Sequence, residues 1–241
     1  MAANKDHGFW PYLAPMFIFL GLIELGGRAP EAAAGVFLTL KVVVPLGLVV
    51  WFASRGRYPE LRGYLVSARG VASDVGIGLL GGAIWMAPYV AFPALGPEPG
   101  DAFDPQLMGE EFVALALGLR FAGYALATPF IEELFVRSWL LRYADVVLER
   151  RDFRKVPIAR YTRRSFLTVV IYFTLSHAPW EFPVSLAWVL LTQWWFYRRG
   201  HLMSLVIVHA ASNGGIFLAV VAAHALLTGA DGAAVDWWFF L

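Results

Sequence analysis

The sequence predicts an all-α fold, a polytopic transmembrane helix bundle of about seven to eight spans. Of the 241 residues, 59% are hydrophobic and only 15% are charged, and the mean hydropathy is +0.61. An ordinary soluble domain of this length is far less apolar. Apolar stretches that approach the roughly 20 residues needed to cross a bilayer also recur along the whole chain. We therefore expect one integral membrane domain over residues 1–241.

The apolar stretches give about seven candidate spans, near residues 9–26, 34–53, 71–93, 112–141, 165–178, 184–197 and 202–228. The fourth is long enough for one tilted helix or for two pieces, because Pro129 removes a backbone donor and favours a kink. The fifth and sixth are short, so we expect them to form a hairpin. Its turn would lie inside the bilayer, surrounded by protein or by a water-filled cavity.

The charges of the loops predict the orientation. Residues 54–70, residues 142–164 and the pair Arg198–Arg199 are basic, whereas residues 94–111 carry acidic residues and no Lys or Arg. The positive-inside rule places the basic loops, and the N-terminus with them, in the cytoplasm. No basic stripe suggests nucleic acid as a partner. The absence of cysteine excludes disulfides, thiolate metal sites and a cysteine nucleophile.

Two carboxylates and a guanidinium lie within the fourth apolar stretch, where charge is costly and indicates function. Glu133 and Arg137 are four residues apart with the acid first, the favourable order for an ion pair. Glu132 lies about 100° further round the helix and has no cation four residues on. Such a carboxylate suits a general base. The alternative is a packing network in which both acids pair with cations.

Two further pairs of residues each share one helix face, namely Phe173 with His177 and His209 with Asn213. Taken alone, His177 could be a structural histidine at a helix end, bonded to a backbone carbonyl. His209 with Asn213 could likewise be an interhelical hydrogen-bond pair. At about 1.5 Å of rise per residue, however, Glu132 and both imidazoles fall near the middle of the bilayer. Their convergence at one depth predicts a buried hydrolytic site.

The three motifs E-E-x-x-x-R, F-x-x-x-H and H-x-x-x-N occur in this order within residues 112–220, the motif-bearing core. Together they resemble the signature of the type II CAAX prenyl endopeptidases and their bacterial relatives, the CPBP or Abi family of glutamate intramembrane proteases. The resemblance implies that Glu132 and His177 activate water and that His209 and Asn213 stabilise the oxyanion. It also implies that three residues support the site: Glu133, Arg137 and Phe173.

The resemblance implies a metal-independent endopeptidase in a bacterial cytoplasmic membrane. Its substrate would be a membrane-associated protein or peptide, with CAAX-type prenylated chains among the candidates. No cofactor and no nucleic acid are expected; the partners are the substrate and the lipid bilayer. One alternative is a zinc ion held by Glu132, His177 and His209. Others are a non-catalytic immunity or scaffold protein on the same fold and a small proton-coupled transporter, although no internal repeat supports the transporter.

Three more charges lie in the apolar stretches. Arg120 stands three turns before Glu132 and could receive a substrate carboxylate, but we expect it to form an ion pair or to snorkel to the outer interface. Glu24 and Lys41 occupy the first two stretches, and we expect them to pair with each other.

Overall fold

The structure is a computed structural model that describes residues 8–64, 67–97, 102–229 and 235–241. Over these residues it contains helices and no strand, which confirms the predicted all-α class. The long helices are α1 (Trp10–Gly27), α2 (Ala34–Ser54), α3 (Ala68–Ala91), a continuous helix over Glu110–Glu149, α7 (Arg163–Leu175), α8 (Phe182–Arg199) and α9 (Leu202–Leu226). The continuous helix includes α4 (Val113–Phe121), α5 (Thr128–Glu133) and α6 (Leu141–Val146).

Within the described residues, five helices are long and apolar enough to cross a membrane, fewer than the seven to eight spans predicted. They are α1, α2 with its preceding turn, α3, the continuous helix and α9. The protein is an integral, multi-pass membrane protein. The two other helices are the expected hairpin: α7 has only 13 residues, and α8 ends in Arg198 and Arg199, which lowers its hydropathy.

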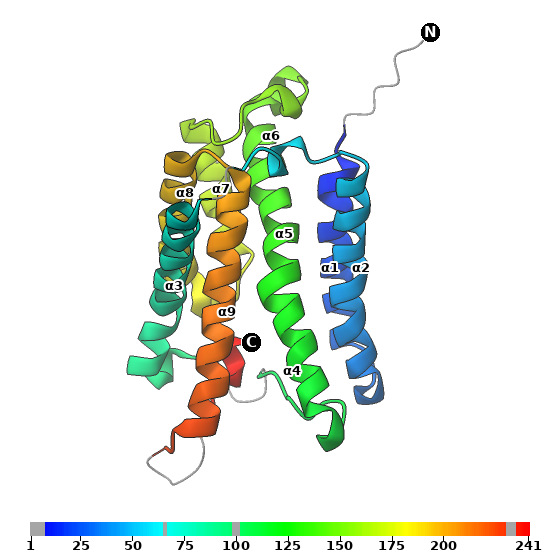
Figure 1. The fold of residues 1–241 in the computed structure, drawn as a ribbon, viewed down its shortest axis with the longest axis vertical. Coiled ribbons are helices and arrows are strands. Elements are labelled where there is room, and N and C mark those ends of the chain that lie inside the picture. Colours follow the sequence, from blue (N-terminus) through cyan, green and yellow to red (C-terminus); the bar gives the residue numbers. More distant parts are fainter. Residues whose placement is uncertain (1–7, 65–66, 98–101, 230–234) are drawn as a thin grey trace.

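The helices are arranged around the continuous helix (Figure 1). The α1–α2 pair packs on one side of it, whereas α3, α9 and the α7–α8 hairpin lie on the other side. The basic loops gather at one end of the bundle, with the start of α1, and the acidic loop lies at the opposite end. This arrangement agrees with the charge asymmetry seen in the sequence. Of the acidic loop, Glu98 and Asp101 lie outside the described residues.

Pro129 does not divide the continuous helix over Glu110–Glu149. The turn before it, Ala122–Ala127, is π-helical, and the amide of Thr128 donates to the carbonyl of Gly123, five residues back. In an α-helix the proline ring would clash with the carbonyl four residues before it. The wider π turn gives this ring room, so the helix continues. A second π-helical stretch, Leu134–Leu140, follows Glu133; such stretches often occur at functional sites.

Helices α3 and α9 pack against each other at close range. A β-carbon added to Gly78 would collide with the carbonyl oxygen of Val208, and one added to Gly82 would lie 3.0 Å from the carbonyl oxygen of Ser212. Small residues four apart let membrane helices approach to backbone contact. This contact fixes the position of α9, which carries His209 and Asn213.

Replacing Gly78 with Ala is expected to lower the melting temperature of the detergent-solubilised protein. The added methyl group must push α9 away, and overpacking of this kind costs about 1–3 kcal/mol. Gly76→Ala is the matched control, because nothing lies within 4 Å of a β-carbon at Gly76 on the same helix. Equal melting temperatures for the two variants would contradict the close contact.

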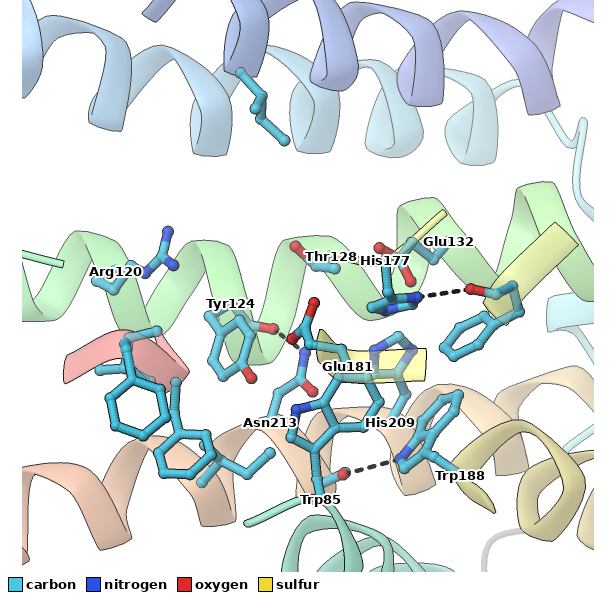
Figure 2. Close-up of a pocket in the computed structure, with 17 residues that line it drawn as sticks. Trp85, Arg120, Tyr124, Thr128, Glu132, His177, Glu181, Trp188, His209 and Asn213 are labelled. Carbon is cyan, nitrogen blue, oxygen red and sulfur yellow. Dashed lines mark hydrogen bonds between the residues drawn. The ribbon is translucent and has the colours of Figure 1, made fainter. Parts of the chain in front are cut away.

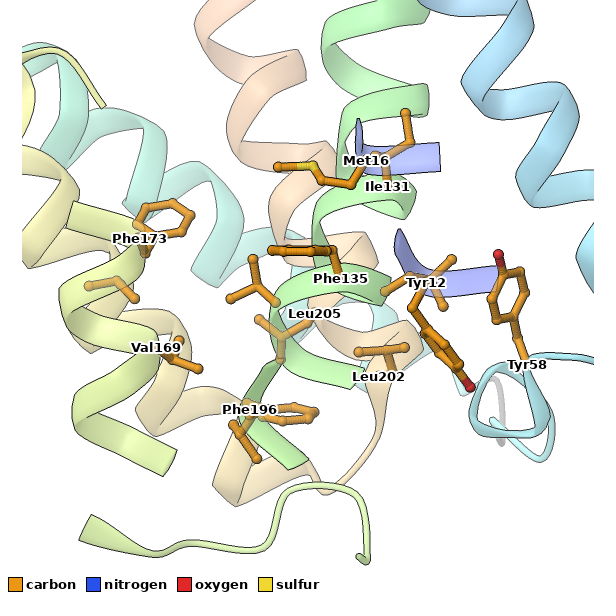
Figure 3. Close-up of a cluster of buried hydrophobic side chains, with 14 of the residues drawn as sticks. Tyr12, Met16, Tyr58, Ile131, Phe135, Val169, Phe173, Phe196, Leu202 and Leu205 are labelled. Atoms are coloured by element: carbon orange, nitrogen blue, oxygen red, sulfur yellow. The ribbon is translucent and has the colours of Figure 1, made fainter. Parts of the chain in front are cut away.

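Among the described residues, two hydrophobic clusters fill the bundle. The first, shown in Figure 3, joins α1, the continuous helix, α7, α8 and α9 through residues such as Tyr12, Phe135 and Leu205. The second joins α3, α9 and the C-terminal segment through Met86 and Ile216. Members of both clusters line one cavity, so the cavity lies where the two clusters meet.

Candidate active site

One cavity of about 390 Å³ collects the polar groups predicted from the sequence (Figure 2). Its lining includes Glu132 from the continuous helix and Phe173 from the C-terminal end of α7, with His177 just after that helix. Helix α9 contributes His209 and Asn213. The expected convergence of three segments is therefore present in the structure. Glu133 and Arg137 do not line the cavity but lie fully buried behind it.

The buried pair behind the cavity orients His209. Glu133 Oε2 lies 3.7 Å from Arg137 Nε, and Glu133 Oε1 lies 2.9 Å from His209 Nδ1. Arg137 also donates to Thr192 Oγ1 at 3.0 Å and sits 5.3 Å over the Phe173 ring. The predicted ion pair thus exists and extends to a histidine. Thr192 is a partner that the motif spacing did not indicate.

The hydrogen bond to Glu133 determines how His209 can act. A carboxylate only accepts hydrogen bonds, so Nδ1 of His209 carries a proton and donates to Glu133. The other ring nitrogen, Nε2, becomes a donor toward the cavity when the ring takes up a second proton. The ring is also held edge-on by Trp188, with ring centroids 4.9 Å apart.

His177 is held by the chain that precedes it. It follows the end of α7, and its Nδ1 lies 2.7 Å from the carbonyl oxygen of Phe173. Nδ1 is therefore the donor, and Nε2 is left to accept a hydrogen bond. The rings of Phe173 and Trp85 flank the imidazole at 4.6 and 5.2 Å. The hydrogen bond to a backbone carbonyl, expected if His177 were only structural, is present, but the ring also lines the cavity.

Glu132 and Asn213 complete the polar lining. Asn213 Nδ2 donates to the carbonyl oxygen of Tyr124 at 2.7 Å, which leaves the second amide hydrogen for another acceptor. Glu132 forms no hydrogen bond and no ion pair with any other described residue. The two neighbouring glutamates therefore differ as expected from the helix geometry: Glu133 is paired, and Glu132 is free.

Several cavity residues were not anticipated. Glu181, in the turn between α7 and α8, adds a second carboxylate side chain to the lining, and it accepts from the amide of Ala178 at 3.1 Å. Tyr124 and Thr128 line the same wall as Glu132. Their spacing of four residues was a signal in the sequence; Glu181 gave none, because it belongs to a connecting turn.

The donor set does not fit the zinc alternative. In the part of the chain that the structure describes, no three His, Asp or Glu side chains lie close enough together to hold a metal ion. Glu132, His177 and His209 line one cavity without forming such a group. The Nδ1 hydrogen bonds of the two imidazoles do not bear on this question, since a metal-binding histidine commonly uses its other ring nitrogen in the same way. We therefore derive no step through a metal.

Comparison with known families identifies part of the chain. Residues 114–215 match the family model described as type II CAAX prenyl endopeptidase Rce1-like. This segment is an Rce1-like domain. It begins in α4, ends in α9 and includes every site residue predicted from the motifs, whereas α1, α2 and α3 precede it. Searches of curated proteins and of solved structures found no significant match.

Proposed function

We propose that the protein is an intramembrane endopeptidase that hydrolyses a peptide bond in a membrane-anchored protein or peptide, with CAAX-type prenylated chains as one candidate class. The observation that carries this proposal is an unpaired carboxylate, Glu132, in a cavity with two oriented imidazoles inside a membrane bundle. The Rce1-like domain supports proteolysis as the reaction class.

The proposed reaction is direct attack by water. Glu132 takes a proton from the water while His177 Nε2 accepts its second hydrogen bond, and the oxygen adds to the scissile carbonyl carbon. Asn213 and protonated His209 donate to the oxyanion that forms. When the intermediate collapses, the C–N bond breaks and Glu132 returns its proton to the departing amine. The products are a new carboxylate and a free amine.

The hydroxyl groups near the site favour water over an acyl-enzyme. Ser176 Oγ donates to the carbonyl oxygen of Phe173 at 2.9 Å, and Ser212 Oγ accepts from Trp188 Nε1 at 3.1 Å. Neither serine hydrogen-bonds a histidine that would activate it. The chain also has no cysteine. A single-step mechanism with water as nucleophile therefore accounts for the residues present.

The charge asymmetry supports a proposed orientation in a bacterial cytoplasmic membrane. The basic loops and the start of α1 lie at one end of the bundle, which we assign to the cytoplasm (Figure 1). Substrates anchored in the bilayer would then meet the cavity from the cytoplasmic side or laterally from lipid.

Cleavage by the purified protein is the test of this function. Wild-type protein in detergent is expected to cut at least one peptide of a panel of farnesylated and unmodified membrane-anchored peptides, at a rate that a chelator leaves unchanged. In ¹⁸O-labelled water, one labelled oxygen should enter the new carboxylate. His177→Ala, which removes the second contact to the water, should lower the rate by about 10²-fold or more. Binding without cleavage would favour the immunity or scaffold alternative, and loss of cleavage with chelator would restore the metal alternative.

A further inference from the structure

We propose that Pro129 is a positioning residue: its missing amide hydrogen leaves the carbonyl oxygen of Tyr124 free to orient the side chain of Asn213 toward the oxyanion. The inference rests on the proposed function and deepens it. Pro129 is buried and does not line the cavity, so it acts on the reaction only through the groups that it holds in place.

The carbonyl oxygen of Tyr124 loses both of its usual helical donors. In an α-helix a carbonyl accepts from the amide four residues on, and in a π turn from the amide five residues on. For Tyr124 these positions are Thr128 and Pro129. The amide of Thr128 donates instead to the carbonyl of Gly123, and proline has no amide hydrogen. This oxygen therefore needs a donor from elsewhere in the bundle.

The side chain of Asn213 supplies the missing donor. Its Nδ2 lies 2.7 Å from the carbonyl oxygen of Tyr124, and Figure 2 shows this bond as a dashed line. Helix α9 runs close to the π turn at this point, since a β-carbon on Gly214 would lie 3.7 Å from that of Ala125. An unsatisfied carbonyl is costly inside a membrane bundle. The contact therefore stabilises both partners.

The Tyr124 carbonyl decides which end of the Asn213 carboxamide faces it. A carbonyl oxygen only accepts hydrogen bonds, so it selects Nδ2 rather than Oδ1. The second hydrogen on Nδ2 then remains for an acceptor in the cavity, which Asn213 lines. A carboxamide that turned freely would also present Oδ1, and an acceptor cannot stabilise a negatively charged oxygen. The backbone contact thus pre-orients one oxyanion donor.

Pro129 keeps the Tyr124 carbonyl available in two ways. It offers no amide of its own, and its ring opposes closure of the π turn to an α-helical turn. With an ordinary residue at this position the turn can close. The amide of Thr128 would then lie four residues from Tyr124 and compete with Asn213 for the same oxygen. A single proline therefore protects the acceptor from the backbone.

Pro129→Ala is expected to lower kcat at least about tenfold and to leave KM unchanged, since an oxyanion donor contributes about 10²–10³ to kcat. The melting temperature should stay equal or rise, because alanine restores a helical hydrogen bond. Pro45→Ala is the matched control. Pro45 also lies inside a membrane helix, α2, which contributes no residue to the described cavity lining, so the rate should not change. An unchanged kcat in Pro129→Ala would overturn the inference.

A double-mutant cycle tests whether Pro129 acts through Asn213. In Asn213→Ala the donor is already absent, so the further change Pro129→Ala should alter kcat by less than about twofold. If the two reductions multiply instead, Pro129 does not work through this side chain. That result would overturn the inference and leave the proposed protease function intact.

Side-chain NMR tests the contact without any cleavage. The sequence has two asparagines, Asn4 and Asn213, so ¹⁵N-asparagine labelling of the detergent-solubilised protein keeps the spectrum simple, and Asn213→Ala assigns the signals. One amide hydrogen of Asn213 should exchange with water roughly fivefold faster in Pro129→Ala than in wild type. Equal exchange rates would contradict the inference. Faster exchange, with no cleavage of any peptide by wild type, would contradict the protease and retain the contact.

Discussion

Glu132→Gln is expected to reduce cleavage by about 10³-fold or more, with no change in melting temperature. Glutamine keeps the shape of the side chain but cannot take a proton from water, and positioned bases contribute roughly 10²–10⁴ to the rate. The fold should not respond, because Glu132 forms no ion pair or hydrogen bond within the described residues. The measurement is kcat/KM on a cleaved peptide, beside a thermal melt in the same detergent.

Glu110→Gln is the matched control for this variant. Glu110 is an exposed carboxylate at the start of the same continuous helix, so its loss should alter neither rate nor melting temperature. Retained cleavage in Glu132→Gln would exclude Glu132 as the base. Glu181 would then be the next carboxylate to test, since it lines the same cavity.

Arg137→Met is expected to destabilise the protein by about 3–5 kcal/mol. Methionine fills much of the same space but leaves Glu133 buried without its cation, and an unpaired buried charge is costly. The variant also loses the bond to Thr192 and the stacking on Phe173. The check is the melting temperature together with the denaturant midpoint in detergent. Activity should fall too, because Glu133 orients His209.

The double variant Glu133→Gln/Arg137→Met separates charge from packing. Removing both charges together avoids the uncompensated carboxylate, so the double variant should be more stable than Arg137→Met alone. It should nevertheless remain inactive, since His209 has lost its carboxylate partner. If the destabilisations of the two single variants simply add, the ion pair is not what stabilises this part of the bundle.

Much of the architecture follows from hydropathy and spacing. Each predicted span overlaps a helix, and the ends agree to within a few residues for most of them, because apolar length is what a bilayer selects. The ion pair of Glu133 with Arg137 also follows from one sequence interval. The number of membrane spans was overestimated from the sequence. Helices α7 and α8 are too short or too polar to be counted as spans on their own.

Other features depend on which helices become neighbours. Nothing in the sequence indicated that Thr192 would reach Arg137, which joins segments far apart in the chain. The expected pair of Glu24 with Lys41 is absent from the described residues: Glu24 pairs with Arg28, and Lys41 lies near enough to Arg120 for the two charges to interact. Glu181 was missed for a different reason, since its place in the cavity depends on how the turn after His177 folds back.

The π-helical turn Ala122–Ala127 sets the rotational phase between the two ends of the cavity. If this turn closed as an ordinary α-helix with the same number of residues, Arg120 would rotate by roughly 100° relative to Glu132, because a π turn takes up about one residue more than an α turn. Pro129 opposes that closure, because an α-helical turn would press the carbonyl of Ala125 against its ring. The proline thus helps to keep Arg120 and Glu132 on the same side of the helix, where both line the cavity.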